Sequence, residues 1–95
     1  MGKLSDQIRV LIRDGRYVVG EHAVEQLEVR GILEWQILAE MEDARLLTER
    51  PNAKPNAAVE FQLQLADGID VKAVWSWLRG INVAKLVTVH FFDRD

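Results

Sequence analysis

Five side chains of this sequence combine the charge and the proton affinity needed for acid–base chemistry on a phosphate ester: His22, Arg30, Lys72, Lys85 and His90. Cleavage of RNA without a metal needs a base for the 2′-hydroxyl proton, an acid for the leaving oxygen, and cations beside the phosphate. Histidine, lysine and arginine can supply all of these roles. This set of residue types therefore permits such chemistry without specifying it.

Three polar residues, His22, Gln26 and Arg30, follow each other at intervals of four, so in a helix they form one ridge. The ridge borders the apolar side of the same helix, so we expect its side chains to be partly covered. The positive end of the helix dipole disfavours a charged imidazole in the first turn, so we expect His22 to be neutral. A structural role fits the same positions, with His22 closing the start of the helix and Arg30 capping its last carbonyls.

Metal-dependent catalysis finds little support in the sequence. The chain has two histidines and no cysteine, whereas a zinc site needs three or four ligands. It also has no H-x-x-x-H pair, no G-x-S-x-G motif, no phosphate-binding glycine loop and no dinucleotide-binding fingerprint. We therefore expect neither a metal ion nor another cofactor.

The length of 95 residues predicts a single domain, residues 1–95, with enough hydrophobic side chains (48%) for one core. No apolar run approaches the roughly 18 residues of a membrane span, and no apolar signal core begins the chain, so we expect a cytoplasmic protein with no membrane partner. The formal net charge is −3 and the pI is about 5.3. Because non-specific nucleic-acid binders are generally basic, a role in RNA binding requires a local patch of positive charge.

Hydrophobic periodicity predicts helices in the first half of the chain and strands in the second. The expected helices are 5–14, 22–30, which ends at a left-handed Gly31, and 34–42. The expected strands are 58–65, 71–78 and 83–92, with 16–19 and 45–49 as short candidates and a proline-containing loop at 51–56. This order predicts an α+β fold in which N-terminal helices pack on one face of a three- to four-stranded antiparallel sheet.

Alternation along the strands predicts which side chains face the helices. Pairing residue 65 with residue 71 places the apolar residues of both strands on the covered face. The last strand is apolar on both faces, so its parity cannot be read from the sequence, and we favour a covered set of Val83, Val87, Val89 and Phe91. The polar residues then share an open face, which Lys85 reaches near the strand end: Glu60, Gln62, Gln64, Lys72, Ser76, Thr88 and His90.

The three tryptophans suggest two uses. They have the chemistry of a base-stacking platform for nucleic acid. Each nevertheless lies among the apolar positions of its segment, so we expect Trp35, Trp75 and Trp77 to be core residues. The expected register pairs the last two with Phe61 and Val59.

The stretch Tyr17-Val18-Val19-Gly20-Glu21-His22-Ala23, followed by Gln26 and then Arg30-Gly31-Ile32, resembles a bacterial family of domains of unknown function, DUF 4258. Members open with a short strand that runs into His-Ala and have Arg-Gly-Ile before the next helix. They end in a strand like Val87-Thr88-Val89-His90. The resemblance covers about residues 16–93, which leaves 1–15 as an extra N-terminal helix.

That family is similar in outline to the RelE/BrnT-like small toxins, whose fold packs helices against an antiparallel sheet. Many of those toxins are messenger-RNA endonucleases that are paired with an antitoxin protein. The resemblance therefore implies an endoribonuclease toxin with RNA and an antitoxin protein as its partners. It maps only His22 and Arg30 onto signature positions.

Two interpretations of the chain remain open. In a metal-independent endoribonuclease, we expect His22, Arg30 and His90 to be catalytic, and a second set to contact the substrate: Gln26, Lys72, Lys85 and Thr88. In a non-catalytic interaction module of the same fold, the open face or an edge strand docks a partner protein. The acidic composition favours the module, whereas the ridge of His22 and Arg30 favours the enzyme. Neither interpretation predicts an oligomeric state.

Overall fold

The computed structural model describes residues 3–92. Within this range the helices are α1 (Lys3–Arg13), α2 (Glu21–Arg30), α3 (Glu34–Glu40) and the short 3-10 helix η1 (Met41–Asp43). The strands are β1 (Tyr17–Val19), β2 (Arg45–Arg50), β3 (Ala57–Gln64), β4 (Asp70–Leu78) and β5 (Val83–Phe91). The α+β class and the predicted order of helices before a β-meander are confirmed, and residues 58–92 contain no helix.

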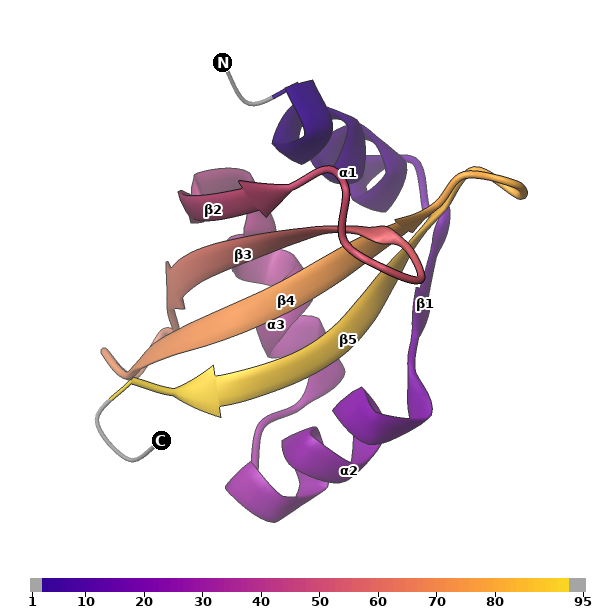
Figure 1. The fold of residues 1–95 in the computed structure, drawn as a ribbon. Helices are drawn as coiled ribbons and strands as arrows, with labels where there is room; N and C mark the ends of the chain where they lie inside the picture. The colour runs from indigo at the N-terminus through magenta and orange to yellow at the C-terminus, as the bar shows by residue number, and fades with distance from the viewer. Residues whose placement is uncertain (1–2, 93–95) are drawn as a thin grey trace.

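The strands form one sheet in the order β1-β5-β4-β3-β2 (Figure 1). β2 to β5 pair antiparallel with their sequence neighbours, whereas β1 pairs parallel with β5, with Tyr17 beside Ala84. The prediction of a three- to four-stranded antiparallel sheet is therefore wrong, because both short candidate strands join the sheet as its two edges. Their places depend on pairing between distant segments, which no local pattern records.

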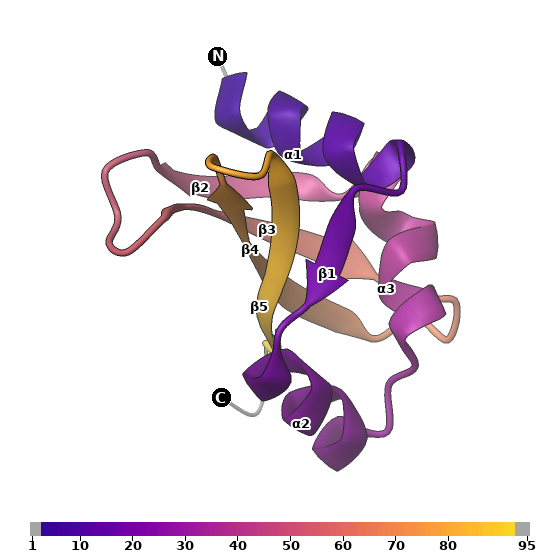
Figure 2. The ribbon, with the colours of Figure 1, turned by 90° about the vertical axis from the view of Figure 1, so that its right-hand side faces the viewer.

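The helices leave one face of the sheet uncovered. In Figure 2, α3 lies on the right of the sheet and the loop between β2 and β3 projects on the left, while α1 crosses the top and contacts β2, β4 and β5. α2 lies beside the part of β5 that β1 does not reach (Figure 1). The fully buried side chains between the layers come from both helices and strands, and they include Ile8, Leu11, Ile37, Phe61, Trp75 and Leu86.

α2 ends where the sequence predicts. Gly31 has a left-handed φ of 68°, and its N–H bonds the carbonyl of Glu28. The N–H of Ile32 bonds the carbonyl of Leu27 at 2.9 Å, and the Ile32 side chain is buried. These two bonds satisfy the last carbonyls of the helix and turn the chain back into the core.

The hairpin of β3 and β4 is displaced by two residues from the predicted register. Leu63, rather than residue 65, lies opposite Val71. The turn sets this register, because the Leu65 N–H donates to the Ile69 carbonyl at 2.9 Å and Gly68 closes the turn with a φ of 88°. A shift of two residues keeps every side chain on its predicted face.

β5 changes the parity of its buried side chains halfway along. Its fully buried residues are Ala84, Leu86 and Val89. The predicted covered set is right for Val89 and Phe91, which pack in the core, and wrong for Val83 and Val87, which are half-buried. The cause is a β-bulge, because the register with β4 shifts by one residue at Val87 and reverses the alternation.

The tryptophans lie in three different environments. Trp75 is fully buried as predicted, although it lies opposite Val59 instead of the expected Phe61. Trp77 is half-buried. Trp35 is 63% exposed, so its predicted place in the core is wrong. The reason is that α3 has seven residues and buries only the narrow stripe around Ile37.

Candidate functional site

The uncovered side of the sheet, which we call the open face, carries most of the residues that the sequence singles out. Directly opposed residues in an antiparallel sheet project from the same face. Lys72 lies opposite His90, and Ser76 lies opposite Lys85. Thr88 shares this face because it lies opposite Val74, which also pairs with Glu60. The structure therefore brings together four of the predicted site residues: Lys72, Lys85, Thr88 and His90.

Glu60 is a carboxylate on the open face whose side chain is only 12% exposed. Its two oxygens pair with different cations, Oε2 with Arg50 of β2 and Oε1 with the Lys72 Nζ of β4 at 3.5 Å. A carboxylate this covered is stable only when it is paired, and two cations against one carboxylate leave the triad with a positive charge. Nothing in the local pattern singles out Arg50, since β2 has no clear alternation of buried and exposed residues.

Lys72 and His90 line one hollow of about 340 Å³ together with Phe91 and Phe92. Because Lys72 and His90 are direct cross-strand partners, their Cβ atoms lie about 4.5–5.5 Å apart. An ammonium and an imidazole at this spacing can contact the same ligand group. The hollow therefore combines a cation with an imidazole, the side chain that serves most often as a general acid or base.

Lys85 and Thr88 lie further along the same face. The stem of Lys85 passes over Gly20, where an added Cβ atom would come within 2.7 Å of the lysine Cε. Gly20 therefore lets the start of α2 approach β5 beneath the lysine. The Thr88 Oγ1 is buried and has no hydrogen-bond partner within residues 3–92. An unpaired buried hydroxyl costs free energy, which a bound polar group would recover.

His22 and Gln26 lie on α2, away from the open face. The His22 side chain is 61% exposed, and its Nδ1 lies 4.0 Å from the Glu25 carboxylate one turn later. Gln26 is half-buried. The expected partial covering of the ridge is therefore found for Gln26 but not for His22. A catalytic role for His22 stays a prediction.

Arg30 completes the edge of the sheet. β1 ends at Val19, so β1 provides no partner for the outer edge of β5 beyond Leu86. The Arg30 Nε donates to the Val89 carbonyl at 3.0 Å, and the guanidinium lies 5.3 Å from the Phe91 ring centroid. Arg30 thus satisfies a backbone acceptor that a longer β1 would satisfy, which is a structural use of this side chain. Phe91 packs against the core and also lines the Lys72–His90 hollow, so Arg30 contacts a residue that the two environments share.

In residues 3–92, no three or more histidine, aspartate or glutamate side chains are grouped so that they could hold a metal ion. None of the helices in this range has the length and apolarity to cross a membrane.

Comparisons with protein-family models, with curated proteins and with solved structures found no match to this chain. The resemblance to the RelE/BrnT-like toxins therefore stays a hypothesis.

Proposed function

We propose that this chain is a small RelE/BrnT-like protein that binds RNA on its open face and cleaves it without a metal, as the toxin of a toxin–antitoxin pair. The observation that carries the proposal is the pairing of Lys72 with His90 around one hollow of about 340 Å³. A proton-exchanging imidazole beside an ammonium is the minimum set for metal-independent phosphodiester cleavage.

The charge of the open face supports the proposal although the whole chain is acidic. By their strand pairing, four cations and two carboxylates face this side: Arg45, Arg50, Lys72, Lys85, Glu60 and Asp70. The excess of cations favours a polyanion on this face, because phosphate contacts supply most of the affinity for nucleic acids.

In the proposed reaction the RNA 2′-oxygen attacks the neighbouring phosphorus, and the bond from phosphorus to the 5′-oxygen breaks. His90 accepts the proton of the 2′-hydroxyl. Lys72 stabilises the charge that develops on the phosphate oxygens and donates the proton that the leaving 5′-oxygen takes up. The products are a 2′,3′-cyclic phosphate and a 5′-hydroxyl, and exchange with water restores both side chains. Glu60, at 3.5 Å from the Lys72 ammonium, holds that group on the open face.

The test is cleavage of single-stranded RNA by the purified protein in the presence of EDTA, with the new ends mapped. We expect 2′,3′-cyclic phosphate ends and a loss of about 10²-fold or more in rate for His90→Gln. His22→Gln is the matched control, because it makes the same chemical change on an exposed helix residue. Activity lost in His22→Gln but kept in His90→Gln would move the reaction centre to α2. Wild-type protein that neither cleaves nor binds RNA at low salt refutes the proposal.

The alternative function, a non-catalytic interaction module, is favoured by one surface. The corner between α2 and α3 exposes three apolar side chains, Val29 (79%), Leu33 (57%) and Trp35 (63%). The neighbouring exposed residues in sequence include Glu28 and Glu34. A partner for this corner would combine an apolar anchor with basic residues. If the product of a small neighbouring gene binds the wild type and loses affinity for Trp35→Ser, while RNA is neither bound nor cleaved, this alternative replaces the first.

A further inference from the structure

Two adjoining cavities lie at the end of the sheet remote from the Lys72–His90 hollow. One, of about 330 Å³, lies between the loop of residues 51–56 and the start of the turn after β4. The other, of about 380 Å³, lies between the same region and the start of α1. Both are lined by Pro51, Trp77 and Arg79, so we treat them as one groove and call it the loop-end groove.

The charged residues that line the loop-end groove are Lys3, Lys54, Arg79 and Glu49. The Glu49 carboxylate accepts a hydrogen bond from the Ser5 N–H at 2.7 Å, in the first turn of α1, where the helix dipole also offsets its charge. No ion pair within residues 3–92 involves any of the three cations. The groove therefore presents uncompensated positive charge in a chain whose net charge is −3, which is the local patch that an RNA-binding role requires.

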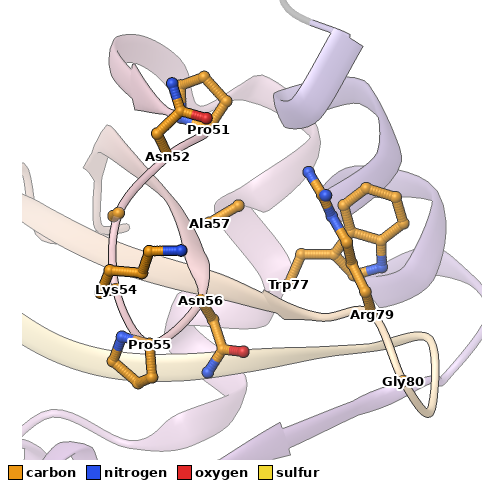
Figure 3. Close-up of a pocket in the computed structure, with 10 residues that line it drawn as sticks. Pro51, Asn52, Lys54, Pro55, Asn56, Ala57, Trp77, Arg79 and Gly80 are labelled. Carbon is orange, nitrogen blue, oxygen red and sulfur yellow. The ribbon is translucent and has the colours of Figure 1, made fainter.

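One wall of the groove is a guanidinium stacked on an indole. Arg79 lies over the Trp77 ring, 4.8 Å from the ring to the guanidinium carbon, and the Trp77 Nε1 donates to the Asn82 Oδ1 at 3.0 Å. That hydrogen bond fixes the indole, and the indole supports the guanidinium plane. A guanidinium held in this way offers its free side to a nucleobase and its N–H edge to a phosphate. In Figure 3, Asn52 and Lys54 come from the loop on the opposite wall.

We infer that the loop-end groove binds single-stranded RNA, with a phosphate between Lys54 and Arg79 and a base stacked on the Arg79–Trp77 pair. The inference rests on the proposed function, since it assigns the groove to the strand that enters the Lys72–His90 hollow. β4 runs between the two places, with Lys72 and Trp77 about 17 Å apart at about 3.4 Å per strand residue. Because the two residues are an odd number of positions apart, Lys72 projects from the open face and Trp77 from the helix-covered face, so the path of the RNA goes around the end of β4. The loop of residues 51–56 projects from the open-face side of the sheet, so it forms a wall at the end of that path (Figure 2).

The test uses Trp77 as the reporter of binding. A Trp35→Phe background removes the exposed tryptophan, and Trp75 is fully buried, so Trp77 is the remaining indole that a ligand in the groove can quench. A His90→Gln substitution in every protein prevents turnover during the titration. The ligands are a short single-stranded oligouridine, UMP and inorganic phosphate.

We expect oligouridine to quench Trp77 and to bind more tightly than UMP or phosphate. Arg79→Gln and Lys54→Gln should each weaken oligouridine binding about fivefold to tenfold and lower the slope of log affinity against log salt by about one. Arg13→Gln is the control, because it removes the same charge outside the groove, at an exposed residue paired with Glu42. Its affinity should change less than about twofold.

Equal affinities of the Arg79→Gln, Lys54→Gln and Arg13→Gln proteins overturn the inference, as does oligouridine binding that leaves Trp77 unquenched. UMP binding as tight as oligouridine overturns the assignment to an RNA strand in favour of a free nucleotide. The proposed function is judged separately, by cleavage with native His90. If the wild type binds RNA in the groove but does not cleave it, only the endonuclease proposal is refuted. If the wild type cleaves RNA but Arg79→Gln does not change the binding, only the groove inference is refuted.

Discussion

Replacing Arg30 with methionine separates a structural role of this residue from a catalytic one. Methionine keeps an unbranched, flexible side chain but removes the donor to the Val89 carbonyl and the charge over the Phe91 ring. An unpaired carbonyl costs about 1–3 kcal/mol, and the lost cation–π contact costs about 0.5–1 kcal/mol. We therefore expect Arg30→Met to lose about 2–3 kcal/mol of unfolding free energy, a large share of the roughly 5–15 kcal/mol of a small domain.

The unfolding free energy is measured by urea unfolding, followed by far-UV circular dichroism. In a separate thermal unfolding experiment, the Tm should fall by roughly 4–8 °C for each kcal/mol lost. Arg45→Met is the matched control, since Arg45 is an exposed cation of β2 that forms no ion pair within residues 3–92. Its stability should change by less than about 0.5 kcal/mol. If the Arg30→Met protein is as stable as the Arg45→Met protein, Arg30 does not stabilise the free edge of β5. If this stable Arg30→Met protein is also inactive on RNA, Arg30 acts in catalysis instead.

Four further substitutions test the core and the charge pairs. Glu60→Gln should destabilise the fold by only about 1–2 kcal/mol, because solvent screens the two partly exposed cations that pair with Glu60. The same substitution should tighten RNA binding, because it removes a negative charge from the open face. A variant with unchanged stability in urea and unchanged RNA affinity would contradict both expectations. Trp75→Ala should cost about 3–5 kcal/mol of unfolding free energy in urea, whereas Trp35→Ala should cost less than about 0.5 kcal/mol. Equal losses would contradict the buried position of Trp75 and the exposed position of Trp35. A hydrogen bond from Arg13 and its charge lower the pKa of Glu42 below its ordinary value of 4.5. The stabilising effect of the Glu42 carboxylate is therefore present above that value and is lost as the pH falls through the lowered pKa. Glu42→Gln should flatten the dependence of stability on pH in this acidic range. Parallel stability profiles of the wild type and the variant would argue against the Arg13–Glu42 pair.

The sequence by itself determined the elements of this chain and the polarity of most strand faces. A helix or a strand depends on neighbours a few residues away, so apolar spacing was enough to predict all three helices and the three long strands. Gly31 marked the end of α2 for a local reason, because its left-handed φ of 68° suits glycine. Alternation in β4 likewise placed Lys72 on the open face, and a two-residue error in the register left that placement intact.

Only the tertiary structure decided how distant segments meet. β1 joins β5 in parallel, Arg30 bonds the edge that β1 leaves free, and a bulge at Val87 resets the face of β5. The loop of residues 51–56 was predictable as a loop, but its place opposite Arg79 was not. The physical reason is the same in each case: these contacts join residues far apart in the chain, and their free energy depends on the packing of the whole sheet rather than on any local pattern.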